Sequence, residues 1–245
     1  ETPTVLTEGS EFYRAEGKTL EVRHAGGGYH QVSLPEGVMR FHMTRRTLTA
    51  ITANNSASLF ALEGDLRLVE FHSKANALTD ESMEIVAAAA ADHGKGIIIH
   101  NDAQHFSAGV DLNAFRAYIE AEDWDGIDGF LDRFQKAVCA LKYTPVPVVG
   151  APSGLAAGGG YEVLAHCDRL VVHTNSVMGL VEAGVGVVPG GGGIKDTFFR
   201  WRAAKDSWDE AAWQTWMNIG YGATGSSPQL SAVSYTHLRA HETPA

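Results

Sequence analysis

Glycine is gathered into three clusters along this 245-residue chain, and the clustering constrains the fold more than any other feature. The clusters are Gly26–Gly28, Gly158–Gly160 and Gly190–Gly193. The first lies between two short alternating stretches and predicts a hairpin turn. The other two lie in loops that follow short apolar runs, where glycine lets a backbone approach another backbone or a ligand closely. We therefore expect a hairpin near the start of the chain and closely packed loops further along.

Short apolar runs alternate with helical patterns from Leu59 onward. The predicted strands cover 59–62, 66–72, 97–99, 146–149 and 170–172, and the predicted helices cover 79–91 and 127–141. Strands that alternate with helices are typical of an α/β domain with mostly parallel pairing. Residues 1–55 lack long apolar periodicity, so we interpret them as a linker with a small β element, followed by a domain over 56–231.

The charge and the cysteine content exclude several classes of protein. The net charge is −10, whereas a protein that binds a phosphate backbone needs a basic face. No apolar run is close to the length of about 18 residues that a membrane-spanning helix needs. The two cysteines, Cys139 and Cys167, are too few for a disulfide framework or a four-cysteine zinc site, which fits a cytoplasmic protein. We therefore expect no nucleic acid, membrane or metal partner.

The glycine-bearing loops lack the motifs of phosphate-binding and serine-hydrolase loops. They offer backbone N–H groups beside small residues, at Ala108–Gly109 after one strand and at Gly158–Gly160 where a helix begins. Two such donors that converge on one oxygen form an oxyanion hole. The alternative is that these glycines only let a helix and a strand pack closely, and the composition by itself favours that alternative.

Two glutamates lie beside these loops. Glu162 directly follows the triple glycine, and Glu182 lies in the otherwise apolar stretch 177–188. Two carboxylates near an oxyanion hole can share one water, one as base and one as acid, if their environments separate their pKa values. The alternative is two glutamates on the surface, which the residues alone favour slightly.

In order and spacing, three loops resemble those of the crotonase (enoyl-CoA hydratase/isomerase) superfamily. The loops are His105–Leu112, Ser153–Glu162 and Met178–Gly193. The resemblance covers about Leu59 to Trp201, including a Pro-Val-Pro-Val run before the second loop. It implies an α/β fold, a crotonase-like spiral of ββα units that is C-terminally truncated and follows an N-terminal linker hairpin. Glu162 and Glu182 are twenty positions apart (182 − 162), as are the two glutamates of the hydratases in this superfamily.

The same resemblance implies roles for individual residues. Glu162 and Glu182 would be the catalytic pair, and the N–H groups of Ala108 and Gly159 would form the oxyanion hole. The residues that would bind the substrate or its CoA part are Lys74, Asn76, Ala77, Gly109, Val110, Asp111 and Gly158. For Lys74, an ordinary surface lysine is an equal alternative.

A narrower resemblance is to bifunctional 3-hydroxyacyl-CoA dehydrogenase/enoyl-CoA hydratases. It rests on the runs 66–74, 122–127 and 179–186, and residues 12–40 resemble the connector between the two enzymes. It implies hydration of trans-2-enoyl-CoA to 3-hydroxyacyl-CoA in fatty-acid β-oxidation, by a homo-oligomer in the full-length parent. No cofactor is implied, because the coenzyme A thioester is the substrate and NAD would serve only the absent dehydrogenase. Two alternatives stay open: a Δ3–Δ2-enoyl-CoA isomerase that uses one glutamate, and a non-catalytic acyl-CoA-binding module.

Both ends of the sequence predict a piece of a longer protein. Position 1 is Glu with no initiator Met, and the superfamily continues with further helices, so we expect a truncated domain with exposed apolar surface. Residues 232–245 are predicted to be non-native and to make no core contacts, because VSYTHLRAHET is the translation of a common transposase library adapter. The zinc-like spacing of His237 and His241 therefore carries no weight.

Overall fold

The computed structural model describes residues 11–16, 19–25, 27–38 and 40–234. The chain divides into two compact units, Glu1–Thr49 and Ala50–Ala245. From residue 235 onward, the tail that the sequence predicts to be non-native lies outside the described residues.

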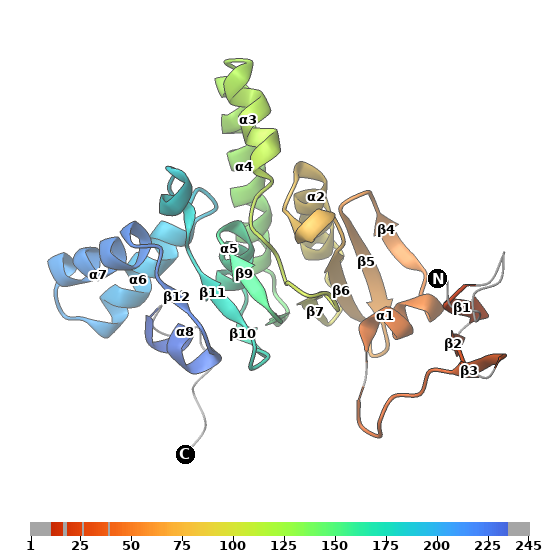
Figure 1. Cartoon of the computed structure of the whole chain (residues 1–245). Coiled ribbons are helices and arrows are strands. Elements are labelled where there is room, and N and C mark those ends of the chain that lie inside the picture. Colours follow the sequence, from red (N-terminus) through yellow and green to blue (C-terminus); the bar gives the residue numbers. More distant parts are fainter. Residues whose placement is uncertain (1–10, 17–18, 26, 39, 235–245) are drawn as a thin grey trace. The chain divides into compact units, whose positions relative to one another are not determined.

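The first unit contains a three-stranded antiparallel sheet in the order β1-β2-β3 (Figure 1). Its elements are β1 (Tyr13–Glu16), β2 (Thr19–Arg23), β3 (Tyr29–Gln31), the short helix α1 (Phe41–Thr44) and the 3-10 turn η1 (Arg45–Thr47). Strands β2 and β3 pair Val22 with His30, so the predicted hairpin is confirmed. Gly27 and Gly28 have φ values of 96° and 74°, a conformation that favours glycine.

The second unit contains a six-stranded sheet in the order β10-β8-β7-β6-β5-β4. The strands are β4 (Ala50–Ala53), β5 (Ala57–Leu62), β6 (Leu66–Phe71), β7 (Gly96–His100), β8 (Val148–Ala151) and β10 (Arg169–Leu170). Pairing is parallel from β6 through β7 and β8 to β10, and antiparallel across β4, β5 and β6. Because β4 pairs with β5, the second unit begins at Ala50, before the boundary that the sequence predicts at residue 56.

The five strands predicted from apolar runs are all present, with two of them shifted: β10 covers Arg169–Leu170, whereas the prediction is 170–172, and β8 starts late. Strand β8 begins at Val148, whereas the apolar run predicts a start at Val146. The reason lies in Pro145 and Pro147, which have no N–H to donate to a neighbouring strand. Pro147 still contributes its carbonyl oxygen, which accepts the N–H of Ile97 at 2.9 Å.

Two helices, α2 (Asp80–Ala91) and α4 (Trp124–Lys142), pack against each other, with α3 (Leu112–Glu120) beside α4. Helix α2 begins after Thr79 as predicted, because Thr79 and Ser82 cap each other's backbone N–H groups. Helix α4 begins before its predicted start at residue 127, because Asp123 accepts the N–H of Gly126 at 2.9 Å. The buried face of α4 is formed by Phe130, Phe134, Ala137, Val138 and Leu141.

A second, smaller sheet positions the glycine-bearing loops. Strand β9 (Leu155–Ala157) pairs in parallel with β11 (Val177–Gly179), which pairs with β12 (Thr224–Gly225). Isolated parallel bridges join Ala156 to Ser107 and Val110 to Leu78. Segments that are far apart in the sequence therefore lie side by side at this sheet.

The remaining elements follow the strands of the second unit. They are η2 (Lys74–Asn76), α5 (Gly159–Ala165), η3 (Glu182–Val185), α6 (Gly193–Ala204), α7 (Trp208–Gly220) and α8 (Pro228–Ser234). Phe199 of α6 and Trp213 and Trp216 of α7 are each more than half exposed. Such a surface favours association with another protein surface. No described helix is both long enough and apolar enough to cross a bilayer.

Candidate active site

Glu162 is held by a glycine-rich turn that lies far from it in the sequence. It belongs to the first turn of α5, and its side chain is only 2% exposed. Its Oε1 atom accepts two backbone N–H groups, from Gly191 and Gly193, each at 2.8 Å. Sequence reasoning did not assign these two residues to the site. The available signal was the cluster Gly190–Gly193, because a side chain at either donor would collide with the Glu162 carboxylate.

The environment of Glu162 favours its protonated form. Burial raises the pKa of Glu162 to about 7, the nearby charges of Glu182 and Asp196 add to this effect, and the two N–H donors partly oppose it. At neutral pH the group is thus present in both protonation states. That is the condition under which a carboxyl group acts efficiently as a general acid or base.

Glu182 lies near the same point of the molecule. It is the first residue of η3 and is half-buried, and its Oε2 atom has no hydrogen-bond partner among the described residues. A Cβ atom placed on Gly158 would lie 3.1 Å from Oε1 of Glu182. Burial raises the pKa of Glu182. Gly158 immediately precedes α5 and Glu162 lies in its first turn, so both glutamates lie near the start of α5, where the charge of Glu182 acts on Glu162.

The two predicted oxyanion-hole segments also lie together. Gly159 is the first residue of α5, so its N–H has no acceptor within the helix. A Cβ atom on Gly109 would lie 3.7 Å from the nitrogen of Gly159. The N–H of Ala108, however, donates to the carbonyl oxygen of Ala75 at 3.2 Å. This bond was not expected from the sequence, and it means that Ala108 has to exchange or share its acceptor before it can bind a ligand oxygen.

The loop around Lys74 lies next to the first oxyanion segment. The N–H of Leu78 donates to the carbonyl oxygen of Gly109 at 2.8 Å. Ala75 and Asn76 have positive φ values of 56° and 51°, which form a tight turn that leaves Lys74 exposed. Strained backbone of this kind is often retained at binding sites.

Three of the predicted CoA contacts have a structural role that the sequence did not indicate. The side-chain amide of Asn76 is buried and donates to the carbonyl oxygen of His105 at 2.8 Å. The carboxylate of Asp111 caps α3 by accepting the N–H of Asn113 at 2.9 Å. Val110 lies 2.8 Å from the point that a Cβ of Gly159 would occupy. These side chains fix the loops. Among the described residues, the side chains of Lys74 and Ala77 make no comparable contact.

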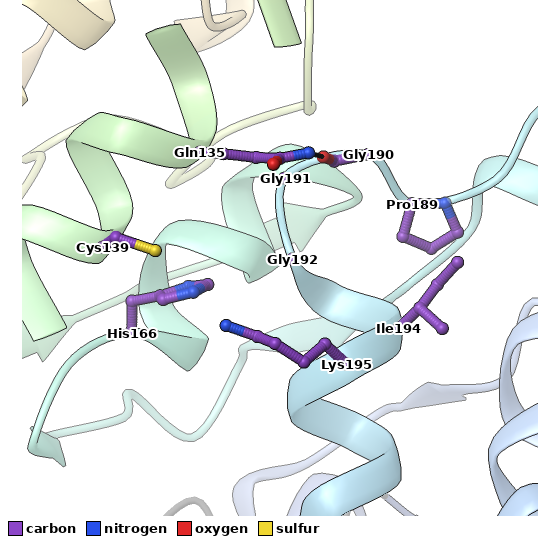
Figure 2. A pocket seen from close by; sticks show the side chains of 9 residues that line it. All are labelled: Gln135, Cys139, His166, Pro189, Gly190, Gly191, Gly192, Ile194 and Lys195. Carbon is purple, nitrogen blue, oxygen red and sulfur yellow. Dashed lines mark hydrogen bonds between the residues drawn. The ribbon is translucent and has the colours of Figure 1, made fainter. Parts of the chain in front are cut away.

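No group of three or more His, Cys, Asp or Glu side chains that could hold a metal ion occurs within the described part of the chain. A pocket of about 310 Å³ lies beside the glycine-rich turn. Figure 2 shows Cys139, His166 and Lys195 around it. Neither Glu162 nor Glu182 is among the residues that line it.

Replacing Gly193 with alanine tests the contact between the glycine-rich turn and Glu162. The added Cβ would lie 2.9 Å from Oε1 of Glu162 and 2.8 Å from a methyl group of Leu180, so the turn has to shift. We expect Gly193→Ala to lower the free energy of unfolding by about 1–3 kcal/mol in urea titrations. Gly184→Ala is the matched control, because the added atom meets nothing within 4 Å. Equal stabilities for the two variants would contradict the described packing.

The sequence profile of the enoyl-CoA hydratase/isomerase family matches residues 66–204. The chain is 32% identical over 231 residues to a protein of Bacillus subtilis named "Probable 3-hydroxyacyl-CoA dehydrogenase". The match covers 92% of this chain and 29% of that protein. It is 33% identical over 102 residues to the fatty acid oxidation complex subunit alpha of Idiomarina loihiensis. This match covers 42% of the chain and 14% of that protein. The chain thus spans less than a third of the length of either relative.

Among solved structures, the chain is similar to an enoyl-CoA hydratase from Geobacillus kaustophilus. The TM-score is 0.64 at 22% identity, and the match covers 76% of this chain and 68% of that one. At this level of identity the likeness concerns the fold. It confirms the α/β fold class that the three loops predict.

Proposed function

The chain belongs to the enoyl-CoA hydratase/isomerase family, and from this premise we propose that it hydrates trans-2-enoyl-CoA to 3-hydroxyacyl-CoA. The observation that supports the proposal is that Glu162 and Glu182 both lie near the start of α5 and both have raised pKa values. An isomerase needs one proton-transferring group at this point, whereas addition of water needs one group to take a proton and another to give one.

In the proposed reaction the thioester oxygen lies between the N–H groups of Gly159 and Ala108. The N–H of Ala108 leaves the carbonyl oxygen of Ala75, to which it donates at 3.2 Å, near the upper limit of an ordinary hydrogen bond. As water adds to C3, negative charge accumulates on the thioester oxygen, and donors aimed at that oxygen stabilise it. Each such donor typically contributes about 3–4 kcal/mol to the stability of a transition state.

The two carboxylates bind the attacking water and move its protons. One carboxylate removes a proton from the water as its oxygen bonds to C3, and the other, in its acid form, delivers a proton to C2. The double bond is consumed, and the product contains the substrate plus one water. Burial raises the pKa of Glu162 to about 7, and the charge of Glu182 adds to this effect, so Glu162 can give or take a proton near neutral pH. The reaction proposed here uses no metal and no organic cofactor.

We further propose that this activity is one step of fatty-acid oxidation in a longer protein. The relatives from Bacillus subtilis and Idiomarina loihiensis support this, since their names refer to a 3-hydroxyacyl-CoA dehydrogenase and to a fatty acid oxidation complex. A dehydrogenase of that kind would consume the 3-hydroxyacyl-CoA formed here. In this proposal residues 12–40 connect the two activities, and the full-length protein is a cytoplasmic homo-oligomer. Lys74, exposed beside the oxyanion segments, binds the CoA phosphates.

Three thioesters distinguish the proposed function from its two alternatives. We expect the chain to convert a trans-2-enoyl-CoA to a product heavier by one water, measured by mass spectrometry, and to do so faster than it converts a 3-enoyl-CoA. Faster conversion of the 3-enoyl thioester, without gain of water, would identify an isomerase. Binding of a saturated acyl-CoA with no turnover of either enoyl thioester would identify a binding module.

A further inference from the structure

The hydroxyl group of Ser107 joins the turn η2 to the loop that contains Ala108. Ser107 is fully buried and directly precedes Ala108 in the chain. Its Oγ atom donates to the carbonyl oxygen of Asn76 at 2.7 Å and accepts the N–H of Gly109 at 3.1 Å. The hydroxyl group therefore acts as a donor toward η2 and as an acceptor toward its own loop, with one bond on each side of Ala108.

The backbone of Ser107 joins the same loop to the smaller sheet. Its N–H donates to the carbonyl oxygen of Leu155 at 3.0 Å, and its carbonyl oxygen accepts the N–H of Ala157 at 3.1 Å. Both partners belong to β9, which ends two residues before Gly159. A Cβ atom on Gly160 would lie only 2.6 Å from Cβ of Ser107, so the start of α5 packs directly against this side chain. Ser107 is thus in contact with both segments of the predicted oxyanion hole.

The bond between Ala108 and Ala75 shows why this anchoring matters. The N–H of Ala108 donates to the carbonyl oxygen of Ala75 at 3.2 Å, and it has to exchange or share this acceptor to bind a thioester oxygen. The loop and η2 then lose a contact that joins them. Two shorter hydrogen bonds remain, from the Ser107 hydroxyl group to the Asn76 carbonyl oxygen at 2.7 Å and from the Asn76 amide to the His105 carbonyl oxygen at 2.8 Å.

We propose that Ser107 is a positioning residue for the oxyanion hole: its hydroxyl group holds the loop in place while the N–H of Ala108 changes its acceptor from Ala75 to the thioester oxygen. The inference rests on the proposed roles of Ala108 and Gly159. It gives Ser107 no contact with the substrate, because both hydrogen-bond partners of its hydroxyl group are backbone groups of the chain.

Removal of the hydroxyl group leaves the N–H of Gly109 without this acceptor and the carbonyl oxygen of Asn76 without this donor. Buried backbone groups are costly when they are unpaired, so the loop is expected to shift until they find other partners. A shift of about 1 Å in a group that acts on the substrate is enough to slow a reaction by about hundredfold. The Ser107 hydroxyl group therefore affects the rate through the place of the Ala108 N–H.

A purely structural role for Ser107 leads to a different expectation. Loss of its hydrogen bonds would then lower the stability of the fold and leave a bound thioester unchanged. Loss of positioning instead changes the thioester itself. N–H groups aimed at the thioester oxygen draw electron density toward it, which weakens the C=O bond and lowers its stretching frequency. The frequency of the bound thioester thus separates the two roles.

The decisive experiment measures the infrared C=O stretch of a saturated acyl-CoA, labelled with ¹³C at the thioester carbon and bound to the full chain. In the unsubstituted chain we expect a frequency below that of the same thioester in water. In Ser107→Ala we expect it to move back toward the value in water. With a trans-2-enoyl-CoA, kcat should fall by about tenfold to hundredfold in Ser107→Ala, while KM changes by less than about threefold.

Two further variants separate positioning from general damage. Ser231 is also fully buried, and its hydroxyl group donates to the carbonyl oxygen of Gly225 at 3.2 Å. Ser231→Ala therefore removes a similar bond from α8 and should leave the stretching frequency unchanged. Ser107→Cys keeps an atom in place of the hydroxyl oxygen, but a thiol is only a weak donor and acceptor. Its frequency and kcat should lie between those of Ser107→Ala and the unsubstituted chain, and it replaces Ser107→Ala in the test if that variant does not fold.

The proposal is overturned if the Ser107 variant and the unsubstituted chain give the bound thioester the same frequency, or if Ser231→Ala shifts it equally. A frequency in the unsubstituted chain equal to that in water would overturn both this proposal and the proposed oxyanion hole. The saturated thioester does not react, so the measurement needs no turnover. The expected shifts in a chain that hydrates no enoyl-CoA would refute the proposed function and leave Ser107 as the residue that positions the Ala108 N–H.

Discussion

Replacing either Glu162 or Glu182 with glutamine is expected to lower kcat for hydration of a trans-2-enoyl-CoA by about 10²–10⁴-fold. Glutamine preserves the size of the side chain and can still accept the N–H groups of Gly191 and Gly193 at position 162. It can neither take up nor release the proton that the reaction moves. The rate is measured by the loss of the conjugated enoyl thioester or by the mass of the product.

The double variant should lose less activity than the product of the two single losses, because the two carboxylates act as a unit. Glu84→Gln is the matched control, since Glu84 lies on the exposed face of α2. Binding of a saturated acyl-CoA should persist in all four proteins. Either single variant with activity close to that of the control would remove that glutamate from the mechanism.

The second large effect is on stability. Replacing Glu162 with glutamine lowers kcat, but it should raise the free energy of unfolding relative to the unsubstituted chain as the pH rises. The pKa of Glu162 is about 7 in the folded chain and near 4.5 without the fold, so between these values the folded state binds more protons than the unfolded state. Stability therefore falls as the pH rises through this window. We expect the titration of Glu162 to lower the free energy of unfolding by about 3 kcal/mol between a pH below 4.5 and a pH above 7.

Glu162→Gln removes this titration, so the variant should become more stable than the unsubstituted chain as the pH rises. Urea titrations at several pH values measure the difference between the two proteins, in which the other titrating groups cancel. Glu84→Gln again provides the comparison, because Glu84 is exposed. A stability difference that does not change between pH 4.5 and pH 8 would contradict the buried, proton-binding state of Glu162.

Much of the fold follows from local patterns in the sequence. Strand β6 and helix α2 could be predicted because each depends on residues close together in the chain. Strand β6 is an apolar run, and α2 begins at its capping residue Thr79. The apolar pattern predicts the start of α4 at residue 127, later than the observed start at Trp124, because the cap formed by Asp123 is not part of that pattern. Likewise, β8 begins only after Pro147, which has no N–H to donate, whereas a pattern of apolar residues takes no account of backbone N–H groups.

The site was less predictable, because its parts come from distant segments. The spacing of Glu162 and Glu182 indicated a pair, but only the fold shows that Gly191 and Gly193 hold one member of it. The hydrogen bond from Ala108 to Ala75 depends on a turn with positive φ at an alanine, which no local pattern announces.

The most direct test of the account is a structure of the chain with a bound saturated acyl-CoA, which occupies the site without reacting. We expect the thioester oxygen at about 2.7–3.1 Å from the nitrogen atoms of Gly159 and Ala108, with Ala108 released from the carbonyl oxygen of Ala75. We also expect C3 of the acyl chain, the atom to which water adds in the proposed reaction, to face one water held between Glu162 and Glu182. A thioester oxygen bound away from both N–H groups, or an acyl chain that does not reach the two carboxylates, would contradict the proposed hydration.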